Sequence, residues 1–213
     1  MKRVLLTGFE PFGAIAGNAS WEAVEAAAER AVPGASIEVA RLPVSFSGAP
    51  AALEEAIGRA APDLVVAVGQ AAGRRAVTVE RVAVNAGNAP IPDNDGHRPT
   101  GEPLVAGGPD AYFTRLPLAA CVAAAREAGV PAAESLTAGS YVCNAVFYRL
   151  MHLAAARNDL LGGFVHVPLV PGQSLDGGHP TIPAELVAEG LVAIVRTSLS
   201  GGGHGGAATG AVH

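Results

Sequence analysis

The sequence has few charged residues and no concentration of positive charge. Charged residues make up 15% of the 213 residues, and 14 Lys and Arg against 19 Asp and Glu give a net charge of -5. An average soluble protein has about 25% charged residues. Without a basic stripe to neutralise phosphates, the sequence argues against nucleic-acid binding. So little surface charge leaves apolar area exposed, which assembly into a homo-oligomer would cover.

Cysteines and long apolar runs are also scarce. Two cysteines, Cys121 and Cys143, are too few for a disulfide framework in a chain of this length. The apolar runs, such as 116–125, reach only about ten residues, short of a membrane span. No signal peptide precedes the first apolar run, KRVLL, and no HExxH or similar spacing indicates a metal site. We therefore expect a cytoplasmic protein with reduced thiols, no membrane contact and no bound metal.

Strand-length apolar runs alternate with Ala- and Glu-rich segments of helical spacing. We expect strands at 3–7, 37–44, 64–68, 76–85, 133–137 and 164–168, and helices at 20–31, 50–61, 117–128, 143–157 and 183–199. Strands that are continuously apolar and alternate with helices indicate a parallel sheet covered on both faces, which is the α/β class.

No repeat or linker divides the body of the chain. Residues 1–199 are predicted to form a single catalytic α/β domain, and the Gly-rich tail 200–213 is predicted to be disordered because it cannot bury enough apolar surface. Residues 86–110, rich in Asn, Asp, Gly and Pro, are predicted to form a long loop. A loop of that length in a compact domain is usually functional or mobile.

The first turn between a strand and a helix reads TGFEPFG, from Thr7 to Gly13. It has neither the GxGxxG spacing of a dinucleotide fold nor the ending of a P-loop, which argues against a phosphate cradle. Phe9 and Phe12 can be read as core residues of a tight turn. Because the turn lies at the sheet edge where α/β proteins bind ligands, they can also form the wall of a site for a flat apolar ligand.

Cys143 follows a turn of small residues and stands where a helix is expected to begin. The helix dipole and the unpaired N–H groups of the first turn would lower the pKa of its thiol and could hold an oxyanion. A buried structural cysteine is the alternative. Cys121 lies among alanines on an apolar helix face, and we assign it to packing.

Two polar residues lie in strands that are otherwise apolar. His166, in FVHVP, is either a satisfied core residue or a base. Val77 and Val79 point to one face of their strand, so Glu80 points to the other, where a carboxylate is costly unless it is paired. Arg81 faces away from it, which makes a histidine on another strand the candidate partner. Cysteine, histidine and carboxylate would then suit a nucleophile, a base and an orienting group, although spacing alone does not bring them together.

Five motifs in this order resemble one family. They are GFEPFG at 8–13, GQAAG with TVERVAVN at 69–85, IPDNDG at 91–96, TAGSYVCN at 137–144 and FVHVP at 164–168. Over residues 1–199 the chain resembles pyroglutamyl-peptidase I, the pyrrolidone-carboxylate peptidase family of cysteine peptidases.

The resemblance implies a three-layer α/β/α sandwich with a mostly parallel central sheet, and no cofactor. It implies removal of N-terminal pyroglutamyl residues from peptides through a thioester acyl-enzyme, often by a homo-oligomer such as a dimer or tetramer. The family's triad falls on Cys143, His166 and Glu80. Its lactam pocket falls on Phe9, Phe12, Asn18, Gln70 and the backbone next to Val142.

Three features depart from the family pattern. Pro90 stands where the family usually has Arg, Glu134 stands where it tends to have an apolar residue, and the Gly-rich tail has no counterpart. A catalytically silent homologue that binds pyroglutamyl or other lactam ends is the alternative function. An unrelated α/β hydrolase or nucleoside-processing enzyme is a third possibility, against which the missing phosphate motif counts.

Overall fold

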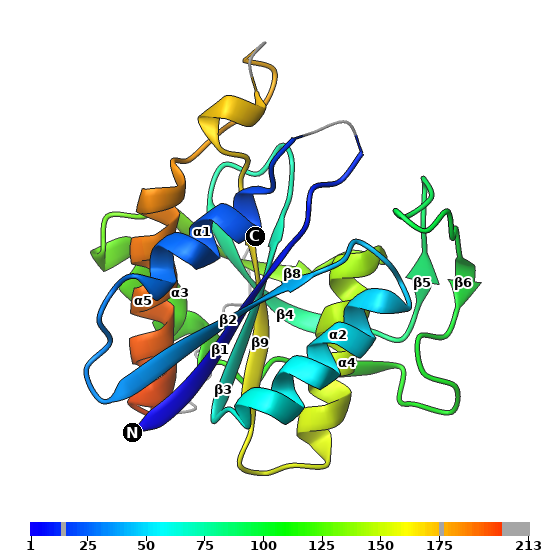
Figure 1. The fold of residues 1–213 in the computed structure, drawn as a ribbon, viewed down its shortest axis with the longest axis horizontal. Helices are drawn as coiled ribbons and strands as arrows, with labels where there is room; N and C mark the ends of the chain where they lie inside the picture. Colours follow the sequence, from blue (N-terminus) through cyan, green and yellow to red (C-terminus); the bar gives the residue numbers. More distant parts are fainter. Residues whose placement is uncertain (14–15, 175–176, 202–213) are drawn as a thin grey trace, which may run out of the picture.

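The computed structural model describes residues 1–13, 16–174 and 177–201. In this part of the chain a seven-stranded sheet forms the central layer, and helices lie on both of its faces (Figure 1). The strands are β1 (Lys2–Phe9), β2 (Ala35–Leu42), β3 (Leu64–Gln70), β4 (Val77–Val84), β7 (Ala111–Phe113), β8 (Ala132–Thr137) and β9 (Leu161–Val167). The helices are α1 (Ala19–Ala28), α2 (Gly48–Ala60), α3 (Leu118–Glu127), α4 (Val142–Ala155) and α5 (Ala184–Leu199), with a short 3-10 turn at Pro171–Gln173.

The sheet is parallel through most of its width. Its order is β2-β1-β3-β9-β4-β7, and β8 also pairs with β4. Strands β2, β1, β3 and β9 are parallel neighbours, as are β4 and β8, whereas β4 runs antiparallel to both β9 and β7. The predicted three-layer α/β/α sandwich with a mostly parallel sheet is confirmed, and each expected strand and helix is present with ends displaced by a few residues.

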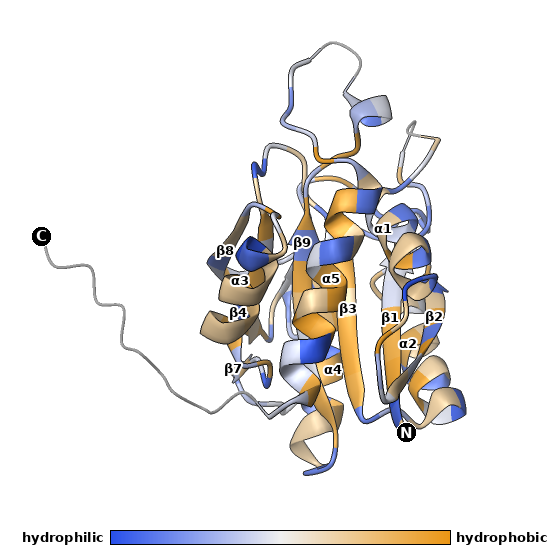
Figure 2. Cartoon of the chain, turned by 90° about the vertical axis from the view of Figure 1, so that its left-hand side faces the viewer, coloured by the Kyte–Doolittle hydropathy of each residue, from blue (hydrophilic) through white to orange (hydrophobic). Residues whose placement is uncertain are grey.

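The two helical layers are held by the alternation of side chains along the buried strands. On β3, Leu64, Val66 and Val68 pack against α1, α3 and α5, while Val65 and Ala67 point to α2 and α4. Figure 2 shows β3 as a largely hydrophobic strand between the helices. A strand covered on both faces has no polar side to give to solvent, so each polar residue on such a strand needs a partner inside the protein.

The prediction of a long loop at 86–110 is wrong in part. Strands β5 (Gly87–Asn88) and β6 (Thr100–Glu102) pair there as a small antiparallel sheet. Between them the carboxylate of Asp93 accepts hydrogen bonds from the backbone N–H groups of Phe46 (2.8 Å), Asp95 (3.0 Å) and His97 (2.8 Å). One buried carboxylate therefore orders the segment that composition alone describes as a loop.

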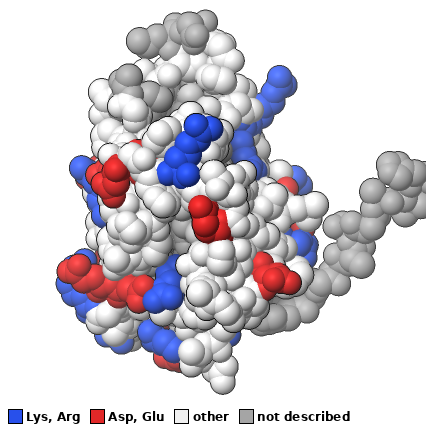
Figure 3. All heavy atoms as spheres, turned by 90° about the vertical axis from the view of Figure 1, so that its right-hand side faces the viewer, with Lys and Arg blue, Asp and Glu red and all other residues white. Residues whose placement is uncertain are grey.

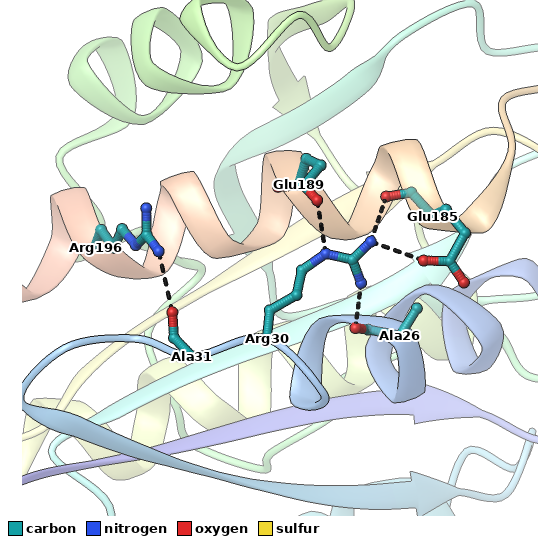
Figure 4. A network of polar contacts seen from close by, with 6 residues as sticks. All are labelled: Ala26, Arg30, Ala31, Glu185, Glu189 and Arg196. Atoms are coloured by element: carbon teal, nitrogen blue, oxygen red, sulfur yellow. Dashed lines mark hydrogen bonds and ion pairs between the residues drawn. The ribbon is translucent and has the colours of Figure 1, made fainter.

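A polar network fastens the end of α1 to α5 (Figure 4). Arg30 pairs through Nε with Glu189 at 2.8 Å and through Nη2 with Glu185 at 2.7 Å. Arg196 Nη2 donates to the carbonyl of Ala31 at 3.0 Å. These contacts fix the position of α1, whose N-cap residue, Asn18, was predicted to belong to the lactam pocket.

Two sequence predictions concern the ends and surface of the chain. From residue 202 onward, the predicted tail at 200–213 lies outside the described residues. Within the described ranges, no helix combines the length and the hydrophobicity needed to cross a bilayer.

Candidate active site

A pocket of about 360 Å³ opens where β1 and β3 end. The carboxyl ends of parallel strands are the usual place for ligand binding in an α/β sheet. All five residues predicted for the lactam pocket line this space, together with Cys143. The full lining is Phe9, Phe12, Asn18, Val44, Gln70, Ala72, Tyr141, Val142, Cys143, Leu169, Gln173 and His179.

The carboxylate of Glu80 and the imidazole of His166 form a buried pair. The antiparallel register of β4 and β9 sets Thr78 opposite His166, and His166 Nδ1 lies 2.8 Å from Glu80 Oε1. Because a carboxylate accepts, Nδ1 carries the hydrogen and Nε2 keeps a lone pair. Burial lowers the pKa of His166, and the hydrogen bond and charge of Glu80 offset this only in part. The imidazole is therefore neutral at pH 7 and can act as a base.

The thiol of Cys143 lies over a glycine beside that imidazole. Gly69 of β3 is the register neighbour of His166 on β9, and a Cβ placed on Gly69 would be 2.8 Å from Cys143 Sγ. The absence of a side chain at Gly69 thus makes room for the sulfur. The geometry brings together the cysteine, histidine and glutamate that the sequence places on three separate segments.

The first turn of α4 carries Cys143 and presents free donors to the pocket. The helix begins at Val142, and Tyr141 at its N-cap makes no side-chain capping bond. The first N–H groups of an α-helix have no acceptor inside the helix and carry a partial positive charge. They are therefore available to an oxygen that gains negative charge next to the sulfur.

The expected lowering of the pKa of the Cys143 thiol is wrong. Burial and the negative charge of Glu80 raise this pKa to about 12, although the backbone N–H of Cys143 and the charge of Arg74 act in the opposite direction. The helix terminus contributes as expected, but desolvation outweighs it. The resting pair is therefore a neutral thiol beside a neutral imidazole.

Two amides organise the polar side of the pocket. Gln70 Oε1 accepts from the Ala19 N–H (3.0 Å) and from Gln173 Nε2 (3.0 Å). Gln70 Nε2 makes no hydrogen bond within the described residues and remains a free donor. Asn18 caps α1 instead: its Oδ1 accepts from both the N–H and the hydroxyl of Ser20. Asn18 thus shapes the pocket, and Gln70 offers it a donor.

Sequence reasoning named neither Arg74 nor six of the residues that line the pocket: Val44, Ala72, Tyr141, Leu169, Gln173 and His179. Arg74 forms an ion pair with Glu80. Its position in the loop directly before the strand of Glu80 could have indicated this pairing from the sequence. Tyr141 stands two residues before Cys143, and its ring packs against Phe12 with centroids 5.7 Å apart. Gln173 reaches the pocket from a turn after β9, and nothing in its sequence context indicates this.

Other sequence assignments are explained by contacts away from the pocket. Cys121 is buried beside Ser198, with Sγ and Oγ 3.5 Å apart, in keeping with a packing role. Arg81 faces away from the pair of Glu80 and His166 and forms an ion pair with Glu134 on β8. This ion pair accounts for the charge of Glu134 at a position where the family tends to have an apolar residue. In the described part of the chain, no three His, Cys, Asp or Glu side chains gather where they could hold a metal ion.

Comparisons with known proteins agree on one family. A family model described as pyroglutamyl peptidase matches residues 2–200. The pyrrolidone-carboxylate peptidase of Streptomyces coelicolor is 52% identical over 199 residues, covering 93% of this chain and 92% of that protein. The pyrrolidone-carboxylate peptidase of Yersinia pestis is 48% identical over 195 residues, covering 91% and 90%.

Solved structures are also similar to this chain. The crystal structure of pyroglutamyl peptidase I from Bacillus amyloliquefaciens has a TM-score of 0.91 at 42% identity, covering 94% of this chain and 98% of that one. A mutant pyrrolidone carboxyl peptidase from Pyrococcus furiosus has a TM-score of 0.89 at 36% identity, covering 93% and 98%.

The space at Gly69 generates a first prediction. In Gly69→Ala the new Cβ would overlap Cys143 Sγ and also lie 2.9 Å from the ring of Phe164, so the thiol must move away from His166. We expect the rate of Cys143 alkylation by iodoacetamide, measured by mass spectrometry, to fall about tenfold or more, because misplacement by about 1 Å can cost as much as 10²-fold in rate. Gly58→Ala, on α2 with no atom within 4 Å of the new Cβ, is the matched control and should leave the rate unchanged. Equal rates in the two variants would contradict this account.

Proposed function

Because the chain belongs to the pyroglutamyl peptidase family, we propose that Cys143, His166 and Glu80 are the residues with which it removes N-terminal pyroglutamyl residues from peptides. The protein is a cysteine exopeptidase of this family, within the catalytic region 1–199. The observation that supports the assignment of roles is the buried Glu80–His166 pair beside Cys143, which itself lines the pocket.

The reaction proceeds by acyl transfer to sulfur. Cys143 Sγ attacks the carbonyl carbon of the pyroglutamyl residue while its proton passes to His166 Nε2, and the N–H groups at the start of α4 stabilise the oxyanion. The carbon–nitrogen bond then breaks, His166 returns the proton to the leaving amine, and a thioester remains. Water activated by His166 hydrolyses the thioester and restores the free thiol.

The raised pKa of Cys143 and the lowered pKa of His166 determine when the proton moves. Both shifts disfavour a thiolate–imidazolium pair, with burial as the first cause of each. Proton transfer is therefore coupled to attack on a bound substrate. Glu80 accepts the Nδ1 hydrogen and stabilises the imidazolium that forms during this step.

The pocket suits a five-membered lactam. Phe9 and Phe12 supply apolar surface for the faces of the ring, and Gln70 Nε2 is free to donate to the ring carbonyl. The backbone next to Val142 completes the binding site, and Asn18 shapes its wall by capping α1. Nothing in this arrangement favours the silent lactam-binding homologue, since the base is paired with its orienting carboxylate and the nucleophile lies over Gly69, the register neighbour of the base.

We also propose that the protein works in the cytoplasm as a homo-oligomer, a dimer or a tetramer. On the face seen in Figure 3, charged side chains of both signs are scattered, with uncharged surface between them. Phe113 on β7 and Leu136 on β8 are 67% and 70% exposed, at the edge of the sheet next to β4. A second copy would remove this apolar surface from water. Peptides with an N-terminal pyroglutamate are the substrates, and neither nucleic acid nor membrane is an expected partner.

The assignment of the nucleophile and the base is tested by substitution. Cys143→Ala or His166→Ala should lower turnover of a chromogenic pyroglutamyl amide by several orders of magnitude, because members of a triad act as a unit. Cys121→Ala should change the rate little, since its sulfur packs against α5. Full activity in Cys143→Ala would end the cysteine-peptidase assignment.

Selectivity tests the pocket. Proline lacks the ring carbonyl of pyroglutamate and, within the ring, its amide N–H, so a bound prolyl residue would leave Gln70 Nε2 unpaired. Sites built to hydrogen-bond a group reject an analogue without it by about 10⁴–10⁵. We expect kcat/KM for a pyroglutamyl amide to exceed that for the matching prolyl amide by several orders of magnitude. Comparable values for the two would contradict the proposed contacts.

Pro90 tests how much the family's usual Arg matters here. Pro90 is exposed and does not line the pocket, and its neighbour Ala89 is held by its N–H to Pro99 O (2.9 Å) and by Arg98 Nε (3.1 Å). We expect Pro90→Arg to change kcat by less than about tenfold, or about 1.4 kcal/mol of barrier, and to lower Tm slightly because proline stiffens the segment. A large gain in kcat at constant KM would show that a charge at this position takes part in the reaction.

A further inference from the structure

Arg74 lies next to the proposed triad without belonging to it. It is in the loop between β3 and β4, and its guanidinium reaches inward to two residues of β4. Nη2 lies 3.1 Å from Glu80 Oε1, and Nη1 donates to Thr78 Oγ1 at 2.7 Å. The side chain of Arg74 is 27% exposed, whereas that of Glu80 is 0% exposed. A partly solvated cation thus contacts a fully buried carboxylate.

The carboxylate of Glu80 has few other partners. His166 Nδ1 and Arg74 Nη2 both meet Oε1, and the Thr78 hydroxyl lies 3.5 Å from the same oxygen. Oε2 is buried and has no hydrogen-bond partner among the described residues. While the imidazole is neutral, Arg74 supplies the positive charge that offsets the cost of burying this carboxylate.

We propose that Arg74 is a positioning residue for the reaction, whose guanidinium holds the Glu80 carboxylate turned toward His166 Nδ1. The proposal rests on the proposed function of the triad. Arg74 acts through Glu80: with Oε1 fixed between the guanidinium and the imidazole, the ring keeps the orientation in which Nε2 faces the thiol. The hydrogen bond from Nη1 to Thr78 Oγ1 holds the guanidinium itself in place. Thr78 is the register partner of His166 on the neighbouring strand, so this bond anchors the guanidinium beside the imidazole.

The charge of Arg74 also acts on both groups that exchange the proton. It lowers the pKa of the Cys143 thiol and that of His166, while the charge of Glu80 raises both. Glu80 on β4 and Arg74 on the adjoining loop are the charged groups that act on this pair in the described residues. Tyr141, at the start of α4, is uncharged because burial raises its pKa to about 12. Loss of the guanidinium leaves the field of Glu80 uncompensated, so both pKa values rise.

The test compares Arg74→Met with Arg75→Met. The Arg75 side chain is exposed and makes no ion pair within the described residues, so its loss removes the same charge from the same loop. We expect Arg74→Met to lower kcat by about 10²-fold, the scale of a misplaced catalytic group. The acid limb of kcat/KM should move to higher pH, with KM within about threefold, and Arg75→Met should match the parent protein. Equal kcat and equal pH profiles in the two variants would overturn the proposal.

Two further variants separate positioning from support of the loop. Arg74→Lys keeps the cation and should recover most of the lost kcat and the parent acid limb. Thr78→Val removes the hydrogen bond to Arg74 but keeps the charge of the guanidinium, so it should affect kcat less than Arg74→Met does. If Arg74 only supports the loop, Arg74→Met should lower Tm and raise KM while leaving the pH profile in place. That result would count against the proposal, and Arg74→Lys provides the comparison if Arg74→Met does not fold.

A readout without substrate distinguishes this proposal from the proposed function. The rate of Cys143 alkylation by iodoacetamide is measured against pH, with buried Cys121 as an internal reference. Arg74→Met should move the midpoint to higher pH relative to Arg75→Met, and an unmoved midpoint contradicts the proposal. If the parent protein does not cleave a pyroglutamyl amide, the proposed function fails, whatever the alkylation profile shows.

Discussion

The buried pair of Glu80 and His166 is the constraint on which the rest of the site depends. It exists because β4 reverses direction against β9 inside an otherwise mostly parallel sheet, which places the two side chains on neighbouring strands. A carboxylate with no exposure must be paired, and here one of its oxygens, Oε1, contacts both an imidazole and a guanidinium. The pairing of the carboxylate with the imidazole is therefore a direct consequence of the topology of the sheet.

The position of the sulfur depends on the absence of a side chain. Gly69 leaves the space that Cys143 Sγ occupies, and Gly69 is aligned with His166 by the register of β3 and β9. Enclosure has an electrostatic consequence, since it raises the pKa of the thiol and lowers that of the imidazole. Both shifts favour a neutral thiol and a neutral imidazole, so the proposed reaction develops charge where the N–H groups of α4 can stabilise the carbonyl oxygen.

The fold could be predicted well from the sequence because buried strands and amphipathic helices leave strong local patterns. Alternation along β4 correctly turned Glu80 away from Arg81, and small residues before Cys143 correctly indicated a helix start. The direction in which the pKa of the Cys143 thiol shifts could not be predicted, because desolvation depends on which residues cover the sulfur in the folded protein. Gln173 was missed for a similar reason: its contact with Gln70 joins segments 103 residues apart.

The IPDNDG motif shows that a motif can identify a family and still contribute no reacting atom. Asp93 binds the backbone N–H groups of Phe46, in the loop after β2, and of His97, in its own segment. Asn94 donates to Glu10 Oε1, which also accepts from the N–H of Val44. These bonds join the loops after β1 and β2. Tyr141, whose hydroxyl donates to Pro92 O, is tied to the same segment. The motif therefore acts as a brace behind the pocket wall. A brace depends on backbone geometry more than on side-chain charge, which explains how proline can occupy the position just before it.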